Sequence, residues 1–161
     1  MSASAEQFAR VERALARVRS NRGRELPEYE DDVWSFFQNA WHLKDWIKND
    51  PELSQKDRDA VEGDVGGLEV LRICADLANR SKHLRLEHKR LDANISKRST
   101  HIHAGAVHLS LSSGSSVVPG YAELIFTIVA DDGREFGVIE TAEQAVAEWR
   151  ELLNRYGVPV A

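Results

Sequence analysis

Cysteine is almost missing from this chain, because Cys74 is the only one among 161 residues. A single cysteine cannot form a disulfide within the chain, and it rules out a zinc site built on several thiolates. Cys74 falls on the apolar side of the helix expected around it, where a small core residue is the simplest interpretation. Sites made of histidine and carboxylate side chains remain open.

Long apolar runs are also lacking. No segment approaches the roughly 20 apolar residues that a membrane-spanning helix needs. The first ten residues, MSASAEQFAR, lack the basic and apolar regions of a secretory signal. Apolar residues make up 42% of the chain and charged residues 29%, as in ordinary globular proteins. We therefore expect a cytoplasmic protein with no membrane partner, folded as a single domain over residues 1–161.

Apolar residues recur at helical spacing through the first half of the chain. The pattern predicts four helices, over residues 4–23, 28–49, 54–63 and from 67 to about 86 or beyond. The second of these should be central, because apolar residues cover most of its circumference. Its stripe and flanks comprise Val33, Phe36, Phe37, Ala40, Leu43 and Ile47, with Trp34, Trp41 and Trp46 beside them.

The second half changes to the alternation typical of strands. We predict strands at 106–112, 121–130 and 135–140, the last two joined by an Asp-Gly turn, and a final helix over 141–156. The expected fold class is α+β. A helical bundle over about 4–90 precedes a small antiparallel sheet of about three strands and a C-terminal helix, over about 102–157.

The stretch 74–88, CADLANRSKHLRLEH, is unusually polar for a helix. At 100° per residue, Asp76, Asn79 and His83 lie within about 60° of one another, on a face roughly 140° from the apolar stripe. One interpretation is a solvated polar face. Another is that these side chains meet His42 and Asp45 of the second helix, which are flanked by tryptophans and would need partners if covered.

Three kinds of chemistry fit this polar inter-helix site of His42, Asp45, Asp76, Asn79 and His83. A metal could bind imidazole and carboxylate ligands from adjacent helices, but no Glu-x-x-His spacing supports it, so we expect neither metal nor cofactor. A hydrogen-bonded network could instead hold the two helices in register. The third kind of chemistry is RNA cleavage, in which Arg80 would stabilise the phosphate while His83 or His88 transferred protons.

A basic segment, residues 80–103, lies inside an otherwise acidic chain. It holds seven Lys and Arg residues against two acids, a local charge of +5 in a chain of net charge −5, so the remainder carries −10. The segment could contact phosphate, or it could be a solvated helix end and loop. The candidate phosphate-binding residues beyond Arg80 are Lys82, Arg85, Lys89, Arg90, Lys97 and Arg98.

The sequences AWHLKDW and CADLANRSKHLRL resemble a group of uncharacterised small bacterial proteins, in which a His-x-x-Asp-Trp helix precedes a helix with Asp-x-x-Asn and Lys-His. More distantly, an Arg shortly before a His at the end of a bundle helix is similar to HEPN domains. Here two residues separate Arg80 from His83 and seven separate it from His88. The HEPN resemblance implies a helical bundle, a homodimer, and ribonuclease activity in a toxin or defence system.

Two functions are compatible with these features. The favoured one is a non-enzymatic binding or interaction module, in which the polar helix pair is structural and residues 80–103 contact an RNA or protein partner. The alternative is a HEPN-like, metal-independent ribonuclease that uses Arg80 with His83 or His88.

Overall fold

The computed structural model describes residues 2–81, 94–103, 121–130 and 132–160. The elements within these ranges are α1 (Ala3–Arg19), α2 (Leu26–Asn49), α3 (Gln55–Gly67), α4 (Glu69–Arg80), β1 (Asn94–His103), β2 (Tyr121–Val129), β3 (Glu135–Gly137) and α5 (Val138–Arg155).

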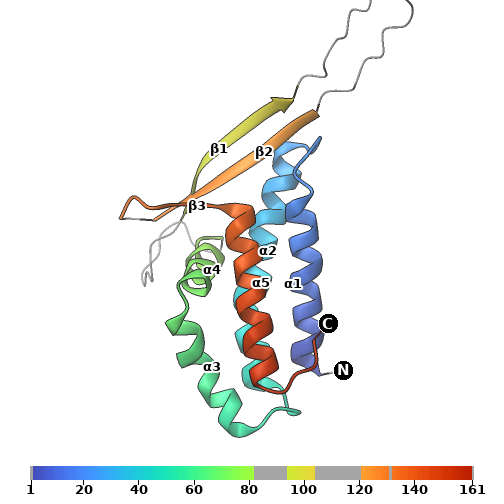
Figure 1. Cartoon of the computed structure of the whole chain (residues 1–161), viewed down its shortest axis with the longest axis vertical. Helices are drawn as coiled ribbons and strands as arrows, with labels where there is room; N and C mark the ends of the chain where they lie inside the picture. Colours follow the sequence, from blue (N-terminus) through green and yellow to red (C-terminus); the bar gives the residue numbers. More distant parts are fainter. Residues whose placement is uncertain (1, 82–93, 104–120, 131, 161) are drawn as a thin grey trace, which may run out of the picture.

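The helices form a bundle and the sheet lies across one end of it (Figure 1). Helix α2 contacts α1, α4 and α5, and α3 leads from the far end of α2 back toward α4. The sheet is antiparallel in the order β1, β2, β3, and α5 follows β3 directly. The molecule is therefore α+β with its helical part first, as the sequence predicts at this level.

Helix α2 forms the centre of the core. Its predicted apolar stripe is buried along its whole length, from Val33 to Ile47. Trp41 is buried as well, whereas Trp34 and Trp46 are half-buried at its flanks. Phe36 and Phe37 meet edge to face with their ring centroids 5.2 Å apart. The prediction that α2 is central is confirmed, because a helix that is apolar on several sides needs neighbours on several sides.

Strand β2 joins the sheet to the bundle. Leu124, Phe126 and Ile128 alternate along it and are buried. The Phe126 ring packs edge-on against Tyr29 of α2, with centroids 5.1 Å apart. Asn21, in the connection between α1 and α2, donates from its side chain to the Leu124 carbonyl at 2.9 Å and accepts from the Leu124 amide at 3.0 Å. Side-chain packing and backbone pairing therefore both fix the sheet on the helices.

Several helix boundaries differ from the sequence prediction, and α1 ends at Arg19 instead of near Gly23. Helix α3 continues past Gly63 to Gly67, because Val61 and Val65 are one turn apart and both buried, which holds the extra turn against the core. Helix α5 begins at Val138 instead of Thr141, and the strand predicted over 135–140 is shortened to β3. Val138 and Ala142 lie on the buried face of α5, so burial favours the helical conformation for both.

Strand β1 was not expected. The sequence predicts no strand over residues 94–103, but they pair with β2 from Asn94 opposite Val129 to His103 opposite Tyr121. Strand pairing depends on a partner that is distant in the chain, so a polar segment with no apolar alternation can still form a strand. The strand predicted at 106–112, and the predicted continuation of α4 toward residue 86, lie outside the described residues.

Candidate functional site at helices α2 and α4

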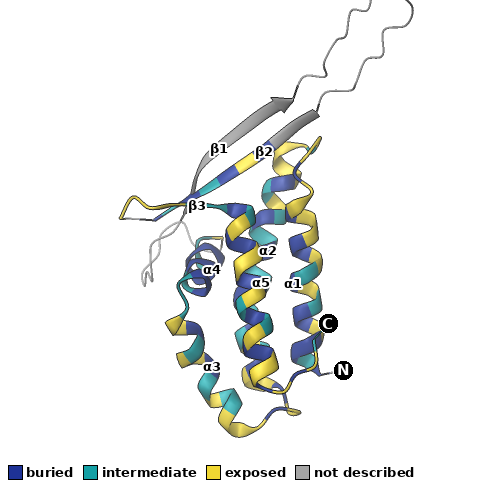
Figure 2. Ribbon diagram, in the orientation of Figure 1, coloured by how far each residue is buried: buried dark blue, intermediate teal, exposed yellow. Residues whose placement is uncertain are grey.

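Helix α4 carries the candidate site and is enclosed over most of its length. Every residue from 73 to 78 is buried (Figure 2), including the fully buried carboxyl group of Asp76. The helix contacts α2, α3, α5 and β1, so neighbours cover the polar side as well as the apolar stripe. The interpretation of a solvated polar face is therefore wrong at Asp76, because periodicity identifies the most apolar side of a helix but not how many sides are covered.

Asp45 and Asp76 do not share an environment. The Asp45 side chain is 52% exposed, and its Oδ1 accepts a hydrogen bond from Lys44 Nζ at 2.7 Å. Lys44 also lies 3.6 Å from the Glu62 carboxylate of α3 and 4.9 Å from the centre of the Trp41 ring. Asp45 therefore belongs to a surface cluster of charges between α2 and α3, and it is not placed with the buried carboxyl of Asp76.

His42 is half-buried on α2, the helix that packs beside α4. His42, Asp76 and Arg80 each take part in an interaction. The pairing of His42 with Asp76 or Asn79 stays a prediction. Asn79 and Arg80 are half-buried in the last turn of α4.

A direct polar contact joins α2 to the end of α4. Gln38 Nε2 donates to Ser81 Oγ at 2.7 Å, and Ser81 Oγ donates in turn to the Ala78 carbonyl at 2.6 Å. The Ser81 amide donates to the Leu77 carbonyl at 3.1 Å. Gln38 precedes His42 by one helical turn, so both lie on one side of α2. Sequence reasoning missed this pair, since glutamine and serine are common surface residues with no distinctive spacing.

The other candidate residues are placed only in part. His83 and His88, and with them Lys82, Arg85, Lys89 and Arg90, lie outside the described residues. Lys97 and Arg98 lie on β1, in register with Thr127 and Phe126 of β2. The basic segment therefore begins in the last turn of α4 and ends in the sheet that crosses the end of the bundle.

Neither a metal cluster nor a reactive thiol is found in the part of the chain that the structure describes. There, no group of three or more His, Cys, Asp or Glu side chains is placed to hold a metal ion. Burial raises the pKa of the Cys74 thiol far above its ordinary value, so this thiol stays protonated and unreactive. Cys74 is a core residue, as its position on the apolar stripe predicts.

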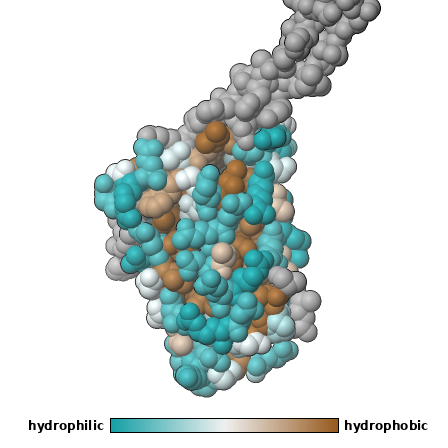
Figure 3. All heavy atoms as spheres, viewed as in Figure 1, coloured by the Kyte–Doolittle hydropathy of each residue, from teal (hydrophilic) through white to brown (hydrophobic). Residues whose placement is uncertain are grey.

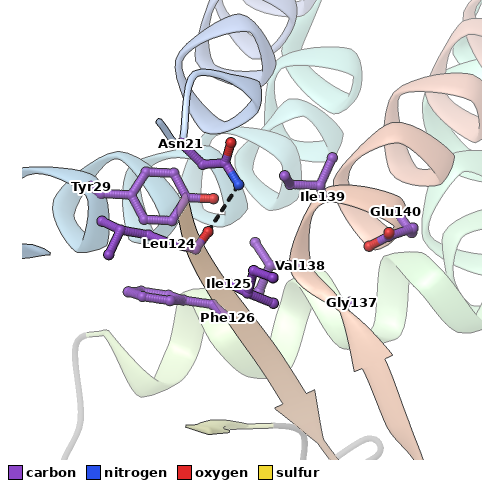
Figure 4. Close-up of a pocket in the computed structure, with 9 residues that line it drawn as sticks. All are labelled: Asn21, Tyr29, Leu124, Ile125, Phe126, Gly137, Val138, Ile139 and Glu140. Atoms are coloured by element: carbon purple, nitrogen blue, oxygen red, sulfur yellow. Dashed lines mark hydrogen bonds between the residues drawn. The ribbon is translucent and has the colours of Figure 1, made fainter. Parts of the chain in front are cut away.

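A separate pocket lies where the sheet meets the bundle (Figure 4). It measures about 230 Å³ and is mainly apolar, with Tyr29, Phe126 and Val138 among its walls. The Glu140 carboxylate points back over Gly137, where an added Cβ would collide with Glu140 Oε2. The sequence gives no sign of this pocket, because its walls come from four segments that only the fold brings together.

The outer surface is mainly hydrophilic on the face shown in Figure 3, with apolar side chains visible between the helices and near the sheet. Ile125 on β2 and Leu26 at the start of α2 are the large apolar residues that are exposed among those described. Within the same residues, every helix is too short or too polar to cross a membrane.

Comparisons with protein-family models, with curated proteins and with solved structures find no match to this chain.

Proposed function

We propose that this chain is a cytoplasmic, non-enzymatic binding module, and that its basic segment 80–103 contacts single-stranded RNA. The observation that carries the proposal is the burial of Asp76. A carboxyl group with no exposed surface cannot touch a substrate in solution, whereas it can hold packed helices in one arrangement through its interaction. Asp76 therefore serves the fold, and binding falls to the basic segment, which begins at Arg80.

Charge supports the choice of RNA as the partner. Residues 80–103 carry +5 within a chain of net charge −5. Lys97 and Arg98 lie on β1, which crosses one end of the bundle. An RNA strand could lie along this extended element and contact it through its phosphates. Arg80, at the other end of the segment, is half-buried at the end of α4.

The direct test is binding of a labelled single-stranded RNA, followed by fluorescence anisotropy. We expect the wild type to bind, and the variant with Lys89, Arg90, Lys97 and Arg98 all changed to Ala to bind much more weakly. The matched control changes four exposed cations outside the segment, Arg10, Lys48, Lys56 and Arg155, to Ala, and it should bind nearly as well. Equal loss in both variants would show a general charge effect and would contradict the proposal.

A HEPN-like, metal-independent ribonuclease is the second candidate. It is supported by the helical bundle and by the position of Arg80, which is half-buried at the end of a core helix and followed by histidines in the sequence. In this mechanism an imidazole transfers protons while the guanidinium steadies the phosphate. The HEPN resemblance implies a homodimer, so this candidate also requires a second copy of the chain.

Cleavage distinguishes the two candidates. A ribonuclease should cut the RNA with a chelator present, and His83→Ala or His88→Ala should abolish cutting while leaving binding nearly intact. A binding module should bind the RNA and leave it whole. Analytical ultracentrifugation of the same sample tests for the dimer.

A further inference from the structure

Gln38 of α2 and Ser81 at the end of α4 form a directional chain of hydrogen bonds. The Ser81 hydroxyl has one hydrogen, and it is donated to the Ala78 carbonyl at 2.6 Å. The hydroxyl oxygen can then only accept from α2, and Gln38 Nε2 donates to it at 2.7 Å. The chain runs from the Gln38 amide through the Ser81 hydroxyl to a carbonyl in the last turn of α4.

This contact lies where the basic segment begins. Arg80 directly precedes Ser81, and the Ser81 amide also donates to the Leu77 carbonyl at 3.1 Å. The carbonyls at the end of a helix have no intrahelical partner, so such ends fray unless side chains satisfy them. Here the capping hydroxyl is itself held by a neighbouring helix, which fixes the backbone of Arg80 relative to α2.

We propose that Gln38 is a positioning residue for RNA binding. By holding Ser81 on α2, it keeps Arg80 in the place from which its guanidinium contacts a phosphate. Ordering the backbone that carries this side chain before binding lowers the entropy lost on binding, and so raises affinity. This inference rests on the proposed function, because it assigns Gln38 a role in the binding carried by residues 80–103.

The position of Gln38 supports this role over a contribution to stability alone. The bond between Gln38 and Ser81 is exposed to solvent, where a hydrogen bond adds little to folding. Gln38 also lies one turn before His42 on α2. His42 therefore lies on the same side of α2 as the contact between Gln38 and Ser81.

The test is a double-mutant cycle read by RNA affinity. Gln38→Ala and Ser81→Ala should each weaken binding about three- to tenfold, and the double variant should be no weaker than the weaker single variant. Ser81→Thr keeps the hydroxyl and should bind like the wild type. Asn49→Ala removes another exposed carboxamide of α2, one that donates within its own helix at 2.7 Å, and it should leave affinity unchanged.

Hydrogen exchange and thermal melts separate positioning from folding. Gln38→Ala should speed exchange of the Ser81 amide while the melting temperature stays near that of the wild type. Faster exchange with unchanged affinity would overturn the positioning role and leave the proposed function standing. Additive losses in the double variant would also overturn it. A wild type that does not bind RNA would overturn both proposals.

Discussion

At the scale of single residues, the two aspartates of the predicted inter-helix site lie in opposite environments. Asp76 is fully buried and engaged in an interaction, whereas Asp45 is 52% exposed and paired with Lys44. Removing a buried group leaves its partner unsatisfied, which costs far more than removing an exposed ion pair. The burial of Asp76 therefore predicts that its substitution lowers the free energy of unfolding far more than substitution of Asp45 does.

We expect Asp76→Ala to lower the free energy of unfolding by about 2–4 kcal/mol, since it leaves a buried partner unsatisfied and creates a small cavity. Asp45→Ala should change it by less than about 0.5 kcal/mol. Urea unfolding followed by circular dichroism gives both values. Equal costs for the two variants would mean that Asp76 is not buried in the protein.

Asp50, the C-cap residue of α2, makes the stability of the fold depend on pH. Burial alone would raise the pKa of its carboxyl group, but hydrogen bonds from Ser4 and from the Glu52 amide outweigh burial and hold the pKa below its ordinary value. The Ser4 amide lies 2.8 Å from Oδ2 and the Glu52 amide 3.1 Å from Oδ1. The charged carboxylate therefore ties the start of α1 to the end of α2.

A lowered pKa in the folded state adds stability above the unfolded pKa of about 3.9, and that stability is lost as pH falls through the folded value. We expect Asp50→Asn to be less stable than the wild type at neutral pH and to lose less stability on acidification below about pH 4. Urea unfolding across this range measures the difference. Parallel pH curves for the two proteins would rule out Asp50 as a contributor.

At the scale of elements, Asn21 joins the helical part to the sheet. Its side chain satisfies the carbonyl of Leu124 on β2, a buried residue, at 2.9 Å (Figure 4). Asn21→Ala should therefore lower the free energy of unfolding by about 1–2 kcal/mol. Asn154→Ala, at an exposed position of α5, should change it by less than about 0.5 kcal/mol. A loss no larger than this control would show that the Asn21 bond does not hold β2.

The sequence predicts the helices better than the sheet. Helix α2 was identified because its apolar residues repeat at the period of the helix itself, a local signal. Strand β1 was missed because its residues, NISKRSTHIH, form a strand through pairing with β2. Helix α5 begins early for a related reason, since contacts with the core favour its first turn. Periodicity in the sequence indicates local structure, whereas the ends of helices and strands depend on contacts with residues distant in the chain.

For the candidate site, the sequence predicts which helix carries each residue better than it predicts how far each residue is buried. Spacing correctly put Asp76, Asn79 and Arg80 on one helix and His42 on its neighbour. It could not show that Asp76 is buried while Asp45 is exposed, because burial depends on how many elements surround a helix. The contact between Gln38 and Ser81 was also beyond reach, since ordinary surface residues become distinctive only when the fold places them together.

At the scale of the whole molecule, charge is distributed unevenly. The basic segment begins at the end of α4 and continues into β1, in a chain that is otherwise acidic. Acidic residues outside the segment repel RNA, so binding should depend on contacts within 80–103. This dependence makes salt the most informative variable, because each phosphate contact releases bound counterions.

The salt dependence of RNA affinity is the decisive measurement of whether residues 80–103 contact phosphate. For single strands, the slope of log affinity against log salt is about −0.7 for each phosphate contact. Changing Lys89, Arg90, Lys97 and Arg98 to Ala should therefore make the slope shallower by about 3, if all four contact phosphate. A steep slope in the wild type that flattens by this amount is the predicted result. An unchanged slope in the fourfold variant would show that the segment is only a solvated surface and does not bind RNA through these four residues.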